Sequence, residues 1–294
     1  SVTDVDVCLL QIQIYSICVL RRDQEVLWHD PLVRLLAALA RRAGVPVVRE
    51  ARSLFADVLD QDMLSRPHCG IIPDLVCELR RTTPGVAGGR ARLVRCLFDV
   101  KTVYAGNVQY GAAGRAGERA GAVERRARLV PAAYDLAARQ QDRQMLVRRA
   151  VAAGGDADAV PALDDLPVGP CLRRLREFPP VTGLVFGSYG EASPGVHTLL
   201  AVLARAVAER EWREMGARTE SEARGIVMAQ MRRQLSLAAH AGHMRVLQAR
   251  CAYVGLAHGA AVAEAARQGA PADAHAAMWP GPEPLGIDGR GSGG

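Results

Sequence analysis

Apolar residues recur at helical spacing in two stretches that flank a β-rich middle part of the chain. Residues 32–42, LVRLLAALARR, place them on one side of a helix that Gly44 ends. Residues 122–149 show the same spacing, and Pro131 inside them predicts a kink or a restart of the helix. A polar loop rich in Asp, Gly and Pro is expected to follow, over residues 154–170.

Short β-branched runs between these helices predict strands. VPVVRE, residues 45–50, is the first. Residues 70–79 and 91–104 are two longer apolar runs, and the loop between them contains a proline and three glycines. The two longer runs therefore predict a β-hairpin.

The last third of the sequence predicts one more strand and then helices. VTGLVFGSY, residues 181–189, is the strand candidate. Ser193 followed by Pro194 is typical of a helix start, so FGSYGEASPG is interpreted as a turn with a cap, since it lacks the lysine of a phosphate-binding loop. Thr219 with Glu222 matches a capping box and predicts helix into the 250s.

The order of elements predicts the fold class and the organisation of the chain. Helix, strand, strand, strand, helix, strand, with helices after them, predicts an α/β protein with a central mixed sheet and C-terminal helices. We expect a strand-like extension over residues 1–28, an α/β core over 29–190, a helical region over 191–268 and a disordered tail over 269–294. Packing or formation of a homodimer is the role expected of the helical region. The start at Ser1 and the ending GRGSGG suggest a piece of a longer protein.

Composition and charge narrow the classes of partner. With 37 Lys and Arg against 31 Asp and Glu, the net charge of +6 weakly favours a polyanion such as nucleic acid. Aromatic residues make up only 4%, so a platform for stacking bases is poorly supplied. Seven scattered cysteines without a CxxC pair indicate a reducing, intracellular compartment, the nucleus in a eukaryote. The run VCLLQIQIYSICVL is short and interrupted by glutamines, so no membrane partner is expected.

The only lysine of the chain, against 36 arginines, lies in the second strand of the predicted hairpin. Because side chains alternate along a strand, Asp99 and Lys101 share a charged face, while Phe98 and Val100 point to an apolar one. Hairpin pairing places Asp74 opposite Asp99, with the side chains about 5 Å apart.

Two carboxylates at that distance repel each other unless a proton or a cation lies between them. Mg²⁺, or Mn²⁺ in its place, takes one or two carboxylates together with water and phosphate oxygens. A lysine fits beside such a site because its ammonium is a compact charge whose pKa can move. Taken singly, a Pro-Asp pair is usually a turn and an Asp-x-Lys pair is often a surface ion pair.

IIPDLV followed by LFDVKTV resembles the PD-(D/E)xK motif of the restriction-endonuclease-like nuclease superfamily. The predicted order of elements is similar to the common core of that superfamily. The resemblance implies that Asp74 and Asp99 are metal ligands, that the Val100 carbonyl completes the metal shell, and that Lys101 orients or activates the attacking water. The long Gly-rich loop after Lys101 departs from the expected core.

Residues 29–50 are also similar to the lead-in of endonuclease domains in some non-LTR retrotransposons, which reads His-Asp/Asn, helix, Gly, strand, Glu. This resemblance adds Glu50 as a catalytic candidate and His29 as a secondary one. Both resemblances together cover residues 29 to about 190.

These observations predict a metal-dependent nuclease that hydrolyses phosphodiester bonds in DNA and is encoded by a mobile element. Phosphate contacts are expected from arginines in or just after the Gly-rich loop: Arg115, Arg119, Arg125 and Arg126. Alternatively, these arginines form an ordinary solvated face of a helix. Two alternatives remain for the whole chain: a non-catalytic nucleic-acid-binding or assembly module that retains the fold, and a helical interaction protein with the sheet as scaffold.

Overall fold

The computed structural model describes residues 25–59, 71–81, 92–103 and 115–267. The chain divides into two compact units, residues 1–246 and 247–294, and the first contains all the strands that are described. The predicted tail lies outside the described residues. So does the predicted N-terminal extension, apart from its last residues, which belong to the helical turn η1, Glu25–His29.

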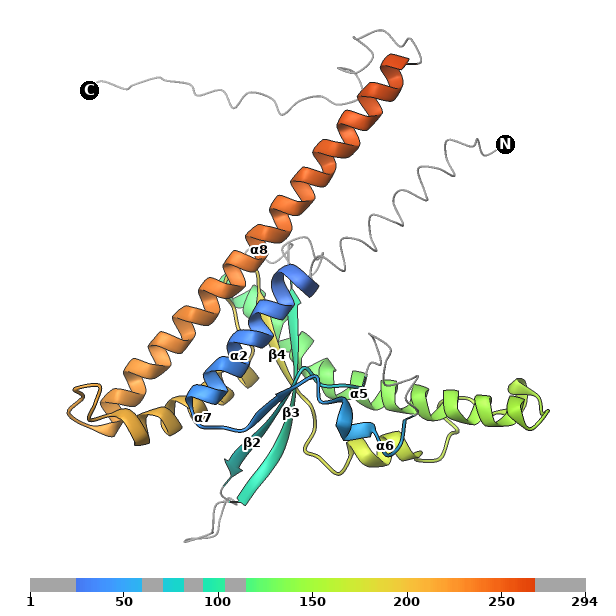
Figure 1. Ribbon diagram of the computed structural model, residues 1–294, viewed down its shortest axis with the longest axis horizontal. Helices are drawn as coiled ribbons and strands as arrows, with labels where there is room; N and C mark the ends of the chain where they lie inside the picture. The colour runs from blue at the N-terminus through green and yellow to red at the C-terminus, as the bar shows by residue number, and fades with distance from the viewer. Residues whose placement is uncertain (1–24, 60–70, 82–91, 104–114, 268–294) are drawn as a thin grey trace. The chain divides into compact units, whose positions relative to one another are not determined.

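A four-stranded mixed sheet forms the centre of the first unit (Figure 1). Its order is β1-β2-β3-β4, with β1 Val47–Arg49, β2 Leu75–Arg81, β3 Arg92–Val103 and β4 Thr182–Gly187. The first three strands are antiparallel neighbours, and β4 pairs with β3 in parallel. The mixed sheet and the β2–β3 hairpin are confirmed, while a restriction-endonuclease-like arrangement stays a prediction.

The register of the hairpin sets the position of the candidate site. Leu75 pairs with Phe98, and Arg81 pairs with Arg92 at the other end. One step beyond the first pair, the same register places Asp74 opposite Asp99, as the sequence predicted. Since β2 begins at Leu75, β3 continues past Asp99 without a partner from β2.

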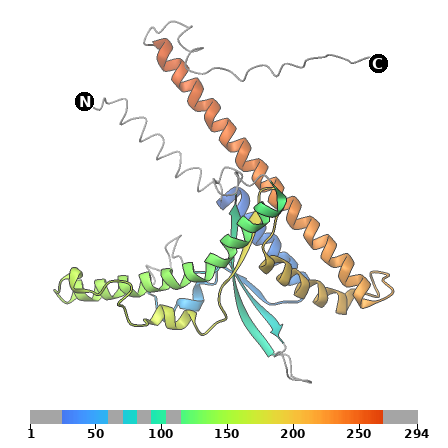
Figure 2. The same ribbon diagram turned by 180° about the vertical axis from the view of Figure 1, so that it is seen from behind.

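Helices cover both faces of the sheet (Figures 1 and 2). One face packs against α2, Asp30–Arg42, α7, Pro194–Glu211, and the first part of α8, Glu220–Arg267. The other face packs against α5, Ala116–Ala152, and α6, Pro170–Leu175. The helices after β4 are therefore part of the same hydrophobic core as α2 and the sheet, up to the end of the first unit at residue 246.

Strand β3 is buried on both faces, which corrects one expectation. Phe98 and Val100 point into the core with α2 and α7, as predicted for the apolar face. The opposite face is charged only in its middle, because Leu97 and Val103 on either side of Asp99 and Lys101 are buried against the α5 layer. A strand with helices on both faces needs apolar residues on both.

Helix α5 begins earlier than predicted, and it does not restart at Pro131, while a kink there stays a prediction. It begins at Ala116, six residues earlier than expected, where the Glu118 carboxylate accepts a hydrogen bond from Arg115 N (3.3 Å). It runs without a break through Pro131, because Val130 and Tyr134 on either side are buried against the sheet. Packing of these side chains outweighs the hydrogen bond that proline removes.

Helix α6 begins at Pro170, the last residue of the predicted loop, and was not predicted from the sequence. Asp142 of α5 provides its N-terminal cap, since its two oxygens accept hydrogen bonds from Cys171 N (2.8 Å) and Leu172 N (3.2 Å). The cap comes from 29 residues earlier in the chain, so no local pattern reveals it.

The starts of α7 and α8 agree with their predictions. Ser193 is the N-cap residue of α7, although its hydroxyl bonds to β4 at Val185 N and Gly183 O. Before α8, Thr219 Oγ1 accepts a hydrogen bond from Glu222 N (3.1 Å), which is one half of the capping box. In the part of the chain that the structure describes, none of the helices combines the length and the apolar character needed to cross a bilayer.

Candidate active site

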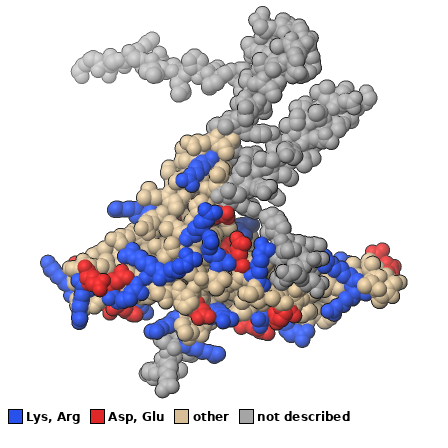
Figure 3. Space-filling model, viewed as in Figure 1, with Lys and Arg blue, Asp and Glu red and all other residues tan. Residues whose placement is uncertain are grey.

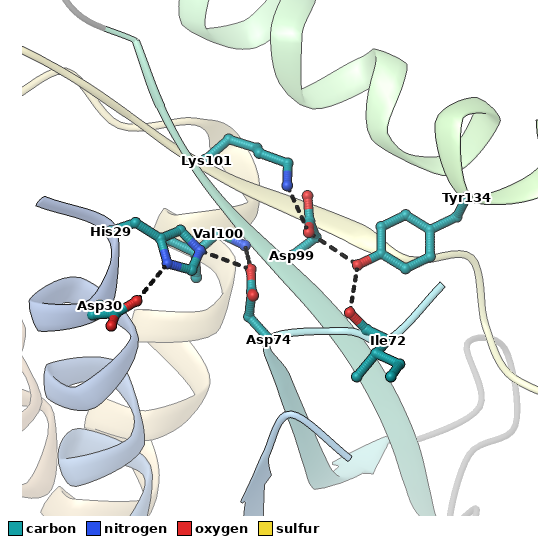
Figure 4. Close-up of polar contacts among 8 residues, drawn as sticks. All are labelled: His29, Asp30, Ile72, Asp74, Asp99, Val100, Lys101 and Tyr134. Carbon is teal, nitrogen blue, oxygen red and sulfur yellow. Dashed lines mark hydrogen bonds and ion pairs between the residues drawn. The ribbon is translucent and has the colours of Figure 1, made fainter. Parts of the chain in front are cut away.

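The candidate site lies where β3 extends beyond the beginning of β2 (Figure 4). Asp74 immediately precedes β2, Asp99 and Lys101 lie in the second half of β3, and His29 lies directly before α2. Asp74 takes the place of a strand partner for β3, because its Oδ2 accepts a hydrogen bond from Val100 N at 2.6 Å. The predicted pair of aspartates and the lysine are thus brought together.

His29 lies between two carboxylates. Its Nε2 is 3.1 Å from Asp74 Oδ2, and its Nδ1 is 3.2 Å from Asp30 Oδ1. Burial alone would lower the pKa of His29, but the hydrogen bonds and the charge of Asp74, with help from Asp30, raise it to about 9. His29 is therefore a cation at neutral pH. Burial would raise the pKa of Asp74, but the His29 cation and the Val100 N–H lower it overall.

Asp99 is the most deeply buried group of the site. Its Oδ1 accepts hydrogen bonds from Lys101 Nζ (3.0 Å) and from the Tyr134 hydroxyl (2.9 Å), which also lies 3.2 Å from the carbonyl of Ile72. Burial and the charge of Asp74 raise the pKa of Asp99 in spite of the ammonium of Lys101. Burial and the negative charge of Asp99 likewise raise the pKa of Tyr134. A further positive charge nearby would therefore stabilise the ionised form of Asp99.

Each aspartate keeps one oxygen that accepts no hydrogen bond from the described residues. Asp99 Oδ2 is buried without such a partner. Asp74 uses Oδ2 for both of its bonds, which leaves Oδ1. The N–H and C=O of one strand residue point to the same side, so the Val100 carbonyl faces the same strand edge as Asp74.

These oxygens fit a hard divalent cation. Mg²⁺ needs only one or two carboxylates, since water and phosphate oxygens complete its shell. Within the described ranges, no set of three or more His, Cys, Asp or Glu side chains is arranged to hold a metal ion, so the two aspartates are the carboxylates on which a metal would rely.

The site is reached from the side of Lys101. The exposed fraction of its side chain is 41%, compared with 19% for Asp74 and 5% for Asp99. Solvent therefore reaches the ammonium of Lys101 more readily than either carboxylate.

Glu50 adjoins this centre through its backbone only. Its N–H donates to the carbonyl of Asp74 at 3.0 Å, and its φ of 45° is unusual for a residue other than glycine. The carboxylate is exposed and pairs with Arg52 at 3.8 Å. The catalytic role assigned to Glu50 from the resemblance stays a prediction, without a side-chain contact to support it.

Of the four predicted DNA-binding arginines, Arg115 is the residue before α5 and the other three lie in its first turns. Arg119 pairs with Glu191 (2.7 Å), and the other three, Arg115, Arg125 and Arg126, are exposed. At about 100° per residue, Arg115, Arg119 and Arg126 share one side of the helix. Elsewhere, positive charge is spread over the visible face of the molecule and interrupted by acidic side chains (Figure 3).

Tyr134 is the residue of the site that sequence reasoning missed. Its spacing of four residues from Val130 puts it on the apolar side of the helix predicted over residues 122–149, a pattern that indicates packing and no role in a site. The signal was its hydroxyl, because a buried tyrosine usually needs a hydrogen-bond partner. The sequence alone does not show that the partner is Asp99, 35 residues earlier.

Comparison of the chain with protein-family models, with curated proteins and with solved structures finds no match in any of the three.

Proposed function

We propose that the chain is a divalent-metal-dependent nuclease of the PD-(D/E)xK type, which hydrolyses phosphodiester bonds in DNA. The observation that carries this proposal is the convergence of Asp74, Asp99 and Lys101 at one partly open strand edge. Each carboxylate has one oxygen that accepts no hydrogen bond from the described residues, and the only lysine of the chain lies beside the two carboxylates. The motif resemblance supplies the substrate class, and the basic net charge agrees with it.

The free oxygens of Asp74 and Asp99, with the Val100 carbonyl, are the groups that would hold Mg²⁺ or Mn²⁺. When bound, the metal would neutralise the carboxylates, polarise the scissile phosphate and lower the pKa of water. His29 contributes to this site because its positive charge lies next to Asp74 Oδ2 and reduces the repulsion between the two aspartates. Tyr134 fixes Asp99 Oδ1 by a hydrogen bond, and Oδ2 accepts none from the described residues.

Lys101 is the group best placed to act on the substrate. Its ammonium is anchored on Asp99 at 3.0 Å, and its side chain is nearly half exposed. From this position it can donate hydrogen bonds to an attacking water and to a phosphate oxygen. Positive charge that is already in place lowers the barrier, because negative charge grows on the phosphate in the transition state.

Cleavage assays on end-labelled DNA with Mg²⁺, Mn²⁺ or chelator test the proposal. Lys101→Ala should lower the cleavage rate at least about 100-fold and leave DNA binding largely intact, because it removes a group that acts in the transition state. Asp99→Asn should lower the rate as well and raise the metal concentration required. Arg95→Ala is the matched control, since Arg95 is an exposed cation on the same strand with its own carboxylate partner, Glu78 (3.0 Å).

Unchanged cleavage by Lys101→Ala or Asp99→Asn would refute the nuclease assignment. Salt-dependent DNA binding with no cleavage in either metal would favour the alternative, a non-catalytic module that retains the fold. Loss of cleavage in Arg95→Ala to the same extent would show that the assay reports on folding rather than on the site.

A further inference from the structure

Tyr189 is an aromatic side chain exposed close to the candidate active site. The exposed fraction of the residue is 62%, and the other large apolar residues exposed in the described ranges are Leu, Val, Ile or Met. The sequence suggested that the chain is poor in base-stacking groups and that the segment around Tyr189 is only a turn. The structure places an aromatic ring on that turn.

The turn is bonded to the end of the strand that carries Lys101. Both the backbone N–H and the hydroxyl of Ser188 donate to the carbonyl of Val103 at 3.1 Å, and Gly190 N donates to the carbonyl of Gly187. Val103 lies two residues after Lys101, which is about 7 Å along a strand. The position of Tyr189 is therefore fixed relative to the catalytic lysine.

The ring itself is held from two sides. The guanidinium carbon of Arg119 lies 4.9 Å from its centroid, and Glu191 fixes that guanidinium at 2.7 Å while accepting a hydrogen bond from Tyr189 N (3.3 Å). On another side the ring of His243 lies 6.5 Å away, centroid to centroid, and in turn 5.3 Å from that of Trp28, the residue before His29. The aromatic surface is thus ordered before any ligand arrives.

The neighbours of the exposed ring indicate what it binds. The three described above, Arg119, Glu191 and His243, are polar or cationic and offer little complement to a broad apolar surface of a protein partner. A nucleobase presents a flat π-face and its strand carries phosphates, which suit an aromatic ring flanked by arginine. Arg115 and Arg126, on the same side of α5 as Arg119, are available for those phosphates.

We propose that Tyr189 stacks against an unpaired nucleobase of the DNA strand that the centre cuts. This inference rests on the proposed nuclease function and extends it to a substrate class: DNA that is single-stranded or locally unpaired beside the cleavage point. In a fully paired duplex the π-face of each base is stacked on its neighbours, so it is not open to Tyr189.

The test uses the complete chain carrying Lys101→Ala, so that DNA is bound and not cut. Oligonucleotides with 2-aminopurine in an unpaired stretch report stacking by quenching, and anisotropy reports affinity on the same DNA and on a fully paired duplex. Tyr189→Ala and Tyr189→Leu should each abolish the quenching and weaken binding of unpaired DNA about 5- to 100-fold, with little change on the duplex. Tyr189→Phe, which keeps an aromatic ring, should restore both signals. Leu129→Ala, at a leucine that is 59% exposed on α5, is the control for loss of an exposed apolar side chain.

The outcomes separate this inference from the function on which it rests. Equal affinity and quenching in Tyr189→Ala and its parent would overturn the stacking site, even if the chain without the Lys101 substitution cuts DNA. An equal loss on paired DNA, or the same loss in Leu129→Ala, would overturn it too. Quenching that depends on Tyr189, in a chain that does not cut with Mg²⁺ or Mn²⁺, would refute the nuclease assignment and support the stacking site.

Discussion

Two glycines of α8 should respond in opposite directions to the same substitution. A Cβ added at Gly242 would lie 2.6 Å from Cδ1 and 3.0 Å from Cα of Trp28, whereas a Cβ at Gly225 would meet nothing within 4 Å. Trp28 is fully buried and directly precedes His29 of the candidate site. The close approach of α8 at Gly242 therefore bears on the helical turn Glu25–His29, which carries His29.

The sizes of the two changes in the free energy of unfolding follow from helix propensity and from the steric overlap of the added methyl group with Trp28. Alanine stabilises a helix interior by up to about 1 kcal/mol relative to glycine, so Gly225→Ala should raise the free energy of unfolding by about that amount. At Gly242 the same gain is opposed, because carbon atoms pack at about 3.5 to 4.0 Å and a buried Trp28 has no space to withdraw. Overpacking of a core costs about 1–3 kcal/mol, so Gly242→Ala should be destabilising on balance.

Urea unfolding followed by circular dichroism at 222 nm measures both variants on the same helix. We expect their free energies of unfolding to differ by about 2 kcal/mol, with the parent protein between them. If Gly242→Ala proves as stable as Gly225→Ala, α8 does not pack on Trp28 as described. If Gly242→Ala is less stable than the parent and also binds the metal more weakly, the packing of α8 on Trp28 affects His29.

Two further substitutions test the contacts that hold the aspartates. Tyr134→Phe should lower the free energy of unfolding by about 2 kcal/mol at pH 7, because buried Asp99 loses one of its two donors, while Tyr189→Phe on the surface should change it by less than about 0.5 kcal/mol. Equal effects in urea titrations would contradict the role given to the Tyr134 hydroxyl. For His29 the folded pKa of about 9 lies above its usual 6.5, so its contribution to stability is complete below pH 6.5 and is lost as the pH rises through 9. In chelator, the stability difference between the parent and His29→Asn should therefore shrink over that range, and a difference that grows with pH would show that Asp74 does not hold a protonated histidine.

Local sequence patterns predicted the elements and the register that form the centre of the site. The hairpin pairing that places Asp74 opposite Asp99 follows from the two apolar runs and the loop between them, and the described pairs have that register. Alternation along the strand placed Asp99 and Lys101 on one face. Both patterns are properties of a backbone with a period of two residues, which a sequence displays directly.

Contacts between distant segments were beyond the reach of the sequence. Tyr134 reaches Asp99 only because α5 packs across β3, and Asp142 caps α6 only because two helices lie side by side. The turn that carries Tyr189 lies at the end of β3 because Ser188 bonds to the carbonyl of Val103. In each case a side chain and its partner lie far apart along the chain.

The pairing of β2 with β3, the α/β class and the grouping of Asp74, Asp99 and Lys101 could be predicted from the sequence, because they depend on neighbours along the chain or across one turn. The charge state of the centre depends on the tertiary structure, since burial and the approach of α2 and α5 set the pKa of His29, Asp74 and Asp99. Electrostatic free energies depend on distance and on solvent access, and chain folding fixes both.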